Sequence, residues 1–524
     1  MPPPAAAAPL PASASDTAFF GHPRGLATLF FTELWERFSY YGMRALLILF
    51  MTAPLAAGGL GFDTAKAGVI YGSYTAAVYL LALPGGWLAD RFLGQRRATL
   101  WGGVVIFLGH VSLAVPSQQS FYLGLALVVI GTGLLKPNIS AMVGQLYAPE
   151  DARRDAGFSI YYMGINLGAF LAPLGCGWLA QGEGFRAWLR AAGIAPEASW
   201  HFGFGLAAVG MFAGLVQYTR GARHLGRAGL EPVLPADPAL RARQARGLRI
   251  ALVGCGGAAA LALAALRAGW IAPDAGSVAR GFGWLLFATV AGFFGWLFLS
   301  RGWTPAERRQ LVVILVLFLA AAVFWSVFEQ AGSTLNLFAE RSTRSELLGI
   351  PFPASWFQSL NAVFIVLLAP LFAWLWVRLG PRDPSSPAKF TLGLFFAAAG
   401  FAILIAAARL AEAGVAVSPL WLAATYLLHT IGELCLSPVG LSAMTRLAPA
   451  RVAGLMMGVW FLAAAVGNYL GGQVASLYEA LSLADLFTAV TGFALGAALL
   501  LALLVRPIGR MVAERRDHLP SRGS

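Results

Sequence analysis

The sequence predicts an all-α membrane protein that crosses the bilayer many times. Of its 524 residues, 58% are hydrophobic and only 12% are charged, whereas a soluble globular protein carries about 25% charged residues. Apolar runs recur from Leu26 to Val505, and each reaches the ~20 residues that a helix needs to cross a bilayer. The surplus of apolar side chains must therefore face lipid, so the chain is expected to be a polytopic membrane protein.

Fourteen transmembrane helices are expected from these runs. Their approximate ranges are 27–53, 66–89, 98–115, 120–146, 156–180, 201–219, 248–266, 281–300, 308–338, 355–379, 389–410, 418–445, 452–475 and 483–505.

The positions of the basic residues indicate how these helices are oriented. With the N-terminus in the cytoplasm, one set of loops and tails carries 26 of the 37 Lys and Arg residues, the opposite set carries eight, and three lie within spans. Cytoplasmic loops are enriched in Lys and Arg, so both termini are expected in the cytoplasm, with the protein in the inner membrane. The net charge of +13 is then a topology signal, which argues against a nucleic-acid partner.

The tail and the cysteines carry no sign of processing or metal binding. Residues 1–25 are expected to be a disordered cytoplasmic tail, because MPPPAAAAPLPASASD has neither the basic start nor the apolar core of a signal peptide. Cys176, Cys255 and Cys435 lie in apolar runs and are expected to fill space in the core, without a disulfide or a metal.

The first span has an unusually polar face. At about 100° per residue, its ionisable and tyrosine side chains fall within an arc of roughly 140°. These side chains are Glu33, Glu36, Arg37, Tyr40, Tyr41 and Arg44. Lipid cannot satisfy such a face, so it is expected to meet a cavity or partner charges. The alternative is a structural ion pair between Glu33 and Arg37 that only holds the helices together.

The segment GGWLADRFLGQRR, residues 85–97, is expected to form the turn between the second and third spans. Gly85 and Gly86 permit close helix contact, and Asp90 can pair with a nearby arginine. The segment resembles the loop between helices 2 and 3 of the major facilitator transporters. A plain basic turn that sets the topology is the alternative.

The order of spans also fits a major facilitator fold, in which substrate binds at mid-membrane between two six-helix bundles. Two inserted helices complete the fourteen. The expected parts are a tail (1–25), an N-terminal bundle (26–219), a basic linker with the two inserted helices (220–307), a C-terminal bundle (308–506) and a basic cytoplasmic tail (507–524).

Two opposite-charge pairs are expected between the bundles. Lys136 and Glu433 each lie about fifteen residues from the outer end of their helix, so at roughly 1.5 Å per residue they share a depth. Arg44 and Glu329 both lie in the outer half of their helices. Such pairs would hold the two bundles together and would break when a proton or a ligand arrived.

Lys136 is notable because the chain has three lysines against 34 arginines. A buried lysine can lose its proton, whereas arginine effectively cannot. Its presence at mid-membrane suggests that compactness or titration matters there, although a chance lysine is the alternative.

Aromatic and amide side chains are candidates for the wall of a central cavity. The aromatic candidates are Tyr41, Tyr79, Tyr161, Tyr162, Trp325, Phe328 and Trp460. Asn166 and Asn361 need hydrogen-bond partners if they are buried, and an interhelical bond would satisfy them equally well. His110 and His429 are expected to be core residues.

The segment ELWERFSYYG, residues 33–42, resembles the helix 1 signature of the proton-dependent oligopeptide transporter (POT) family. Four further segments follow in family order: GTGLLKPN, YYMGINLG, FWSVFEQAGS and GELCLSP. The resemblance extends from Phe19 to about Arg506, and the two inserted helices resemble those of bacterial members. It implies proton-driven import of di- and tripeptides and of peptide-like drugs, by a monomer in contact with membrane lipid and with no cofactor other than protons.

The resemblance also implies roles for individual residues. Glu33, Glu36, Arg37 and Glu433 match proton-coupling positions. Arg37 and Lys136 match groups that face the peptide carboxylate, and Glu433, helped by Asn166 and Asn361, matches the one that faces the amino group. Arg44–Glu329 and Lys136–Glu433 match the periplasmic and cytoplasmic gates. The remaining pocket positions are Tyr41, Tyr79, Tyr162, Trp325, Phe328, Ser437 and Trp460.

One position departs from the animal members of the family, which carry a histidine where this chain has Gly72. Proton coupling is therefore expected to fall to carboxylates. Three other readings stay open: a symporter for another small solute such as nitrate or an amino acid, a receptor that uses the same pocket without transport, and a membrane-embedded enzyme. The chain lacks GxSxG, HExxH and paired intramembrane aspartates, so it is not expected to be an enzyme.

Overall fold

The computed structural model describes residues 16–148, 150–232, 234, 237–270, 274–449 and 451–513. Within them, fourteen helices have 19 or more residues. They are α1 (Arg24–Thr52), α2 (Thr64–Leu88), α3 (Gln95–Leu113), α4 (Gln118–Gln145), α5 (Arg154–Gln181), α7 (Ser199–Gly221), α8 (Pro238–Arg267), α9 (Ala275–Leu299), α10 (Pro305–Phe328), α12 (Ser359–Leu379), α13 (Ser386–Glu412), α14 (Pro419–Leu447), α15 (Met456–Ala475) and α16 (Leu483–Ala513).

Twelve of these helices are long and apolar enough to cross a membrane by length and composition alone. The other two are α1 and α3. Apart from the exposed Arg24 at its first position, helix α1 carries charged residues at positions 33, 36, 37 and 44, and these four are buried inside the protein. Helix α3 has Arg96 and Arg97 in its first turn and His110 in its last. Together the fourteen long helices match the polytopic all-α architecture expected from the sequence.

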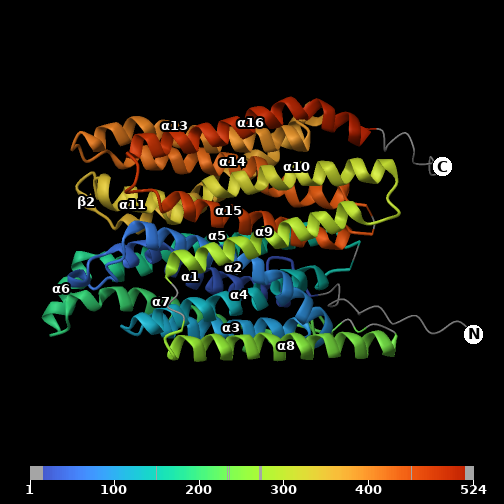
Figure 1. Ribbon diagram of the computed structural model, residues 1–524, viewed down its shortest axis with the longest axis horizontal. Coiled ribbons are helices and arrows are strands. Elements are labelled where there is room, and N and C mark those ends of the chain that lie inside the picture. Colours follow the sequence, from blue (N-terminus) through green and yellow to red (C-terminus); the bar gives the residue numbers. More distant parts are fainter. Residues whose placement is uncertain are drawn as a thin grey trace, which may run out of the picture.

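Two groups of helices pack mainly among themselves, and they occupy the lower and upper halves of Figure 1. In the N-terminal half the largest contacts join α3 with α4 and α1 with both α5 and α7. In the C-terminal half they join α13 with both α16 and α14, and α10 with α15. The lower group is the N-terminal half of the sequence, as its blue and green colours show (Figure 1).

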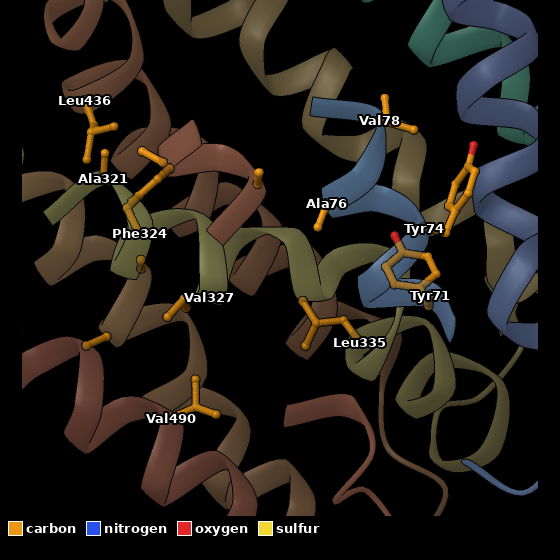
Figure 2. Packing of buried hydrophobic residues seen from close by; sticks show 14 of the residues in the cluster. Tyr71, Tyr74, Ala76, Val78, Ala321, Phe324, Val327, Leu335, Leu436 and Val490 are labelled. Carbon is orange, nitrogen blue, oxygen red and sulfur yellow. The ribbon is translucent and has the colours of Figure 1, made fainter. Parts of the chain in front are cut away.

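The two halves also pack directly against each other. The main contacts are those of α2 with α15 and of α5 with α12. Figure 2 shows Leu335 of the C-terminal half close to Tyr71 of α2, with Tyr74 on one side of this pair and Phe324 farther away on the other. All four belong to one continuous hydrophobic cluster, so the halves share buried surface instead of meeting only through polar groups.

The expected helix 308–338 is not continuous. Helix α10 ends at Phe328, a 3₁₀ turn η5 (Glu329–Gly332) follows, and the short helix α11 (Thr334–Ser342) completes the segment. At the break, a Cβ on Gly332 would lie 1.9 Å from the Tyr71 hydroxyl and 2.9 Å from Arg44 Nε. The chain therefore bends where it approaches two polar side chains of the other half.

Short elements that the sequence did not reveal lie at one end of the bundle. Helix α6 (Glu183–Ala191) and the hairpin of β1 (Glu346–Leu347) and β2 (Ile350–Pro351) are at the left-hand end of Figure 1. Both are too short for a hydrophobic pattern to stand out. We call this the hairpin end, and the end that carries the turn between α2 and α3 the basic end.

The expected disordered tail of residues 1–25 is wrong for its described part. Residues 1–15 lie outside the described residues, but Asp16 Oδ2 accepts a hydrogen bond from the amide of Arg24, at 3.0 Å, where α1 begins. Phe19 packs against Phe30, and His22 shares a 2.9 Å hydrogen bond with Tyr147. Aromatic contacts thus fix the approach to α1. Residues 514–524 of the expected C-terminal tail also lie outside the described part, and 507–513 continue α16.

The two inserted helices differ in their packing. Helix α9 contacts α2 from one half and both α10 and α15 from the other, and it crosses in front of the bundle in Figure 1. Helix α8 lies along the lower edge of that view (Figure 1), and none of the described part of its apolar window is buried. Residues 226–228, which follow α7, are fixed, because Arg96 donates to the carbonyls of Ala228 (2.7 Å) and Gly226 (2.6 Å).

Candidate functional site

The charged face of α1 forms a buried cluster. Arg37 binds Glu36 through Nε and through Nη2, which lies 2.6 Å from Glu36 Oε1, and its Nε is 3.3 Å from Glu33 Oε1. The three side chains are at most 4% exposed. Glu33 Oε2 has no hydrogen-bond partner among the described residues. One arginine thus serves two carboxylates, so a proton on either carboxylate would loosen it.

Arg44 and Glu329 form an ion pair between the two halves. Arg44 Nη2 lies 2.7 Å from Glu329 Oε2, and Arg44 Nε donates to the Tyr71 hydroxyl at 2.8 Å. Glu329 is the first residue of the 3₁₀ turn η5. The pair expected from the sequence is therefore present, and it is sealed from solvent.

Lys136 of α4 lies beside the α1 cluster. Its electrostatic neighbours include Arg37, Glu36 and Glu33. Its ammonium group lies 4.0 Å from the centre of the Tyr79 ring and 5.9 Å from that of Phe461, which belongs to α15 in the other half. Two cations, Arg37 and Lys136, thus converge on one place from two helices.

Glu433 of α14 is held on the opposite side. Asn361 Nδ2 donates to Glu433 Oε2 at 3.0 Å and to Thr430 Oγ1 at 3.1 Å. Tyr162 of α5 and Tyr41 of α1 are electrostatic neighbours of Glu433, and Tyr41 is also a neighbour of Arg37. Tyr41 is therefore an electrostatic neighbour of both the Arg37 cation and the Glu433 carboxylate.

The expected ion pair between Lys136 and Glu433 is not formed. Both residues lie in the described part of the chain, and no nitrogen–oxygen contact within 4.0 Å joins them there. Lys136 instead contacts Tyr79, and Glu433 contacts Asn361. Among the described residues, neither charge thus forms an ion pair across the gap.

Aromatic rings form the C-terminal side of the site. The Trp325 ring lies 5.5 Å from that of Phe328 and 6.2 Å from that of Trp460. Trp325 Nε1 and Ser437 Oγ are buried polar atoms without a hydrogen-bond partner among the described residues. An unpaired buried donor is costly, so these two atoms are suited to bind a polar ligand. Asn166 is less free, because its Nδ2 donates to the Tyr162 carbonyl one turn earlier, at 3.0 Å.

A cavity of about 840 Å³ opens near the site at the basic end. Its lining comes from both halves and from α9, and it includes Pro137, which follows Lys136, and Phe461, which Lys136 faces. Towards the hairpin end the halves are joined by polar contacts. Gln181 Nε2 donates to Glu340 Oε2 at 3.0 Å, and Asn336 Nδ2 to the Ala45 carbonyl at 2.8 Å. The molecule is thus closed at the hairpin end and hollow towards the basic end.

Known proteins are similar to this chain in both structure and sequence. The sequence model described as the POT family matches residues 96–233 and 292–491, more than half of the chain. The chain belongs to the POT family. It is therefore a multi-pass membrane transporter and not an enzyme.

Relatives in this family cover nearly the whole chain. The peptide transporter YePEPT of Yersinia enterocolitica is 41% identical over 505 residues, which is 94% of this chain and 96% of the relative. A di-/tripeptide transporter of Lactococcus lactis subsp. cremoris is 38% identical over 517 residues, covering 96% and 99% of the two chains. A crystal structure of a peptide transporter POT in complex with sulfate has a TM-score of 0.87 and 42% identity, covering 96% of this chain and 97% of that one.

Gly72 has a packing role in this POT-family chain. A Cβ on Gly72 would lie 2.5 Å from the Cα of Gly472, and a Cβ on Gly472 would lie 2.3 Å from the Cα of Gly72. The two glycines therefore let α2 and α15 touch backbone to backbone. An imidazole has no room at this position while the helices are so close.

Three residues near the site were not predicted from the sequence. Tyr71 binds Arg44, Thr430 binds Asn361, and Phe461 faces Lys136. Tyr71 lies eight residues before Tyr79, which is close to two helical turns, so a common helix face was its available signal. Thr430 precedes Glu433 by three residues and could have been found in the same way.

Proposed function

We propose that this chain is a proton-coupled symporter that imports di- and tripeptides, and peptide-like drugs, across the inner membrane by alternating access. The names of its relatives support the substrate class, since they include a peptide transporter and a di-/tripeptide transporter. A related POT structure contains alafosfalin.

The observation that carries this proposal is the separation of charge across the site. Arg37 and Lys136 come from the N-terminal half, Glu433 comes from the C-terminal half, and Tyr41 is a neighbour of both Arg37 and Glu433. A peptide zwitterion has one anionic and one cationic end, so it would bridge the gap between these groups. The aromatic rings of Trp325, Phe328 and Trp460 offer apolar surface that accepts different side chains, and ordered waters can fill the remaining space.

The unpaired state of Lys136 and Glu433 fits the proposed cycle. The pairing of Arg44 with Glu329 and the hollow basic end support an inward-facing conformation in this cycle. Both termini would lie in the cytoplasm, as the basic loops indicate. Pairing of Lys136 with Glu433 would close that side, and release of Arg44 from Glu329 would open the other.

Protons would act on the carboxylates that face the two cations. A proton on Glu33, Glu36 or Glu433 would remove a negative charge and free Arg37 or Lys136 for the peptide carboxylate. One proton charge that moves inward supplies about 2.3 kcal/mol per 100 mV, which is enough to accumulate a substrate coupled one-to-one. No cofactor besides the proton is needed. We further propose that the working unit is a monomer surrounded by lipid, with no nucleic-acid partner.

Uptake of labelled di-alanine into proteoliposomes under an imposed proton gradient tests this function. Wild-type protein should accumulate the peptide, whereas Glu36→Gln and Lys136→Ala should lose driven uptake. A Lys66→Ala variant is a matched control, because Lys66 belongs to the first turn of α2 and is partly exposed. Driven uptake equal to wild type in both site variants would contradict these roles.

Competition and exchange separate the remaining alternatives. Tripeptides should inhibit di-alanine uptake, while nitrate and free amino acids should not. Peptide-loaded vesicles should exchange their content with external peptide. A protein that binds peptide but shows no exchange would be a receptor, and this outcome would refute transport.

A further inference from the structure

A second large hollow lies far from the peptide site. It is a groove of about 950 Å³ at the hairpin end of the N-terminal half, lined by residues of α1, α5 and α7 and by the turn between α3 and α4. Small residues make it hollow. A Cβ on Gly205 of α7 would meet no atom closer than the Cβ of Ala114, 4.0 Å away. None of the charged groups of the peptide site lines it.

The groove has the length of one bilayer leaflet. It reaches from Ala198, just before α7 begins at Ser199, to Val209, and ten helical residues rise about 15 Å. Half of the ~30 Å hydrocarbon core is a similar distance. Phe202 and Val209 expose 40% and 61% of their surface. These are apolar residues on a membrane helix, so the groove faces lipid along its length.

The polar side chains of the groove lie near one end, and they include His201, one helical turn beyond Glu197. Glu197, Ser117 and Gln118 line it beyond the first residue of α7 or at the start of α4. Glu197 is exposed, and no cation among the described residues lies within 4.0 Å of its carboxylate. The first turn of α4 offers the positive end of a long helix. A free carboxylate beside a helix N-terminus matches a headgroup with both an ammonium and a phosphate.

Contacts within the protein also fix the backbone at the polar end of the groove. Trp200 Nε1 donates to the Ala57 carbonyl at 3.0 Å, which ties the loop after α1 to the start of α7. Gly58, with φ of +78°, lies against Glu197, because a Cβ there would be 2.2 Å from the Glu197 carbonyl oxygen. The backbone that carries Glu197 is therefore held in place without a ligand.

We propose that this groove binds one amine-bearing phospholipid of the leaflet at the hairpin end. An acyl chain would lie along α7 from Phe202 to Val209, and the headgroup ammonium would pair with Glu197. The shape alone would accept any acyl chain. The carboxylate selects phosphatidylethanolamine over phosphatidylglycerol, because the latter has no positive charge.

Native mass spectrometry of the delipidated full-length protein tests this proposal. The probes are phosphatidylethanolamine and phosphatidylglycerol with identical acyl chains. Gly205→Ala, Gly205→Val and Gly205→Leu fill the groove progressively, and the retained phosphatidylethanolamine should fall with side-chain size, at least tenfold for leucine. Gly292→Leu on α9 is the control, because its Cβ also meets no atom within 4 Å and it lies outside the groove. The alanine variant adds one carbon in open space, so it keeps the series informative if the leucine variant does not fold.

A Glu197→Gln variant tests the headgroup contact separately. It should lower the preference for phosphatidylethanolamine over phosphatidylglycerol at least threefold while acyl-chain binding persists. Retention of lipid by all three Gly205 variants at the wild-type level would overturn the groove assignment. An equal loss in Gly292→Leu would overturn it too. Equal affinity of wild type for the two lipids would overturn the headgroup assignment.

Discussion

Arg44 of α1 and Glu329 of η5 lie 2.7 Å apart, in side chains that are each 7% exposed. This contact joins the two halves near the point where α10 ends. Removal of one partner from a buried pair leaves an uncompensated charge and costs about 3–5 kcal/mol. The closed hairpin end therefore depends on both residues.

A Glu329→Gln variant should open the hairpin end. Arg44 would then keep its bond to the Tyr71 hydroxyl but lose its negatively charged partner, so the closed conformation would lose population. Spin labels at positions 183 and 346, exposed on opposite halves, should report a longer mean distance in the variant. Arg341→Ala is the control, since it breaks a more exposed pair with Glu479. An unchanged distance distribution would show that other contacts keep this end closed.

Two replacements of Tyr79 should distinguish the contribution of its aromatic ring to peptide affinity from that of its hydroxyl group. The Lys136 ammonium lies 4.0 Å from the ring centre, and such a contact is worth about 0.5–2 kcal/mol. Tyr79→Phe should keep dipeptide affinity, while Tyr79→Leu should raise the half-saturating concentration roughly two- to thirty-fold. Concentration-dependent uptake measures both. Equal losses in the two variants would assign the role to the hydroxyl group.

An Asn361→Ala variant should weaken recognition of the peptide amino group. Asn361 donates to Glu433 at 3.0 Å, and a neutral donor of this kind contributes about 0.5–1.5 kcal/mol. The concentration of di-alanine that halves uptake of a labelled peptide should rise about two- to twelve-fold. An N-acetylated dipeptide lacks the ammonium group and is the matched probe. If its affinity fell by the same factor, the effect would not concern the amino end.

A Gly472→Ala variant should force α2 away from α15. The new Cβ would lie 2.3 Å from Gly72 Cα, and overpacking of a close contact costs typically about 1–3 kcal/mol. The variant should unfold at a lower temperature and lose uptake. Gly292→Ala, at an open position on α9, should be neutral or slightly stabilising because alanine favours helix. Wild-type stability of Gly472→Ala would mean that the helices separate at no cost.

The pH should govern the contact of Arg341 with Glu479 outside the spans. A hydrogen bond from Arg341 lowers the pKa of Glu479 below its usual value of 4.5. Because the folded pKa is lowered, the stabilisation is present above pH 4.5 and is lost as the pH falls through the folded value. Glu479 is half exposed, so only about 0.2–1 kcal/mol is expected. Melting temperatures of wild type and Glu479→Gln should differ at pH 7 and converge near pH 3. A constant difference would exclude this ion pair as its cause.

Much of the fold followed from hydropathy and charge. Long apolar runs gave the fourteen helices to within a few residues at most ends, because a membrane imposes a minimum length on each span. The break at Glu329–Gly332 was missed, because the residues that it contacts, Tyr71 and Arg44, are distant in the sequence and no local pattern encodes such a contact. Helix α6 and the hairpin were missed because they are short.

The candidate site, like the fold, was predicted only in part from the sequence. The sequence pointed to Glu33, Glu36 and Arg37 because charges on one face of a membrane helix need partners, and they are found together. It did not determine which charges touch across the halves. Arg44 and Glu329 pair while Lys136 and Glu433 do not, and this difference depends on conformation. The backbone contact of Gly72 with Gly472 was also invisible, because glycine has no side chain to suggest a partner.

The position of Glu329 at the break between α10 and α11 has a consequence for how this segment can move. The carboxylate that holds Arg44 belongs to the joint between α10 and α11. Loss of the contact between Arg44 and Glu329 would allow α11 to rotate about η5 while α10 remains packed against α15. Glu329 would then both hold the hairpin end closed and belong to the turn about which α11 moves, so protonation of this one carboxylate would act on both.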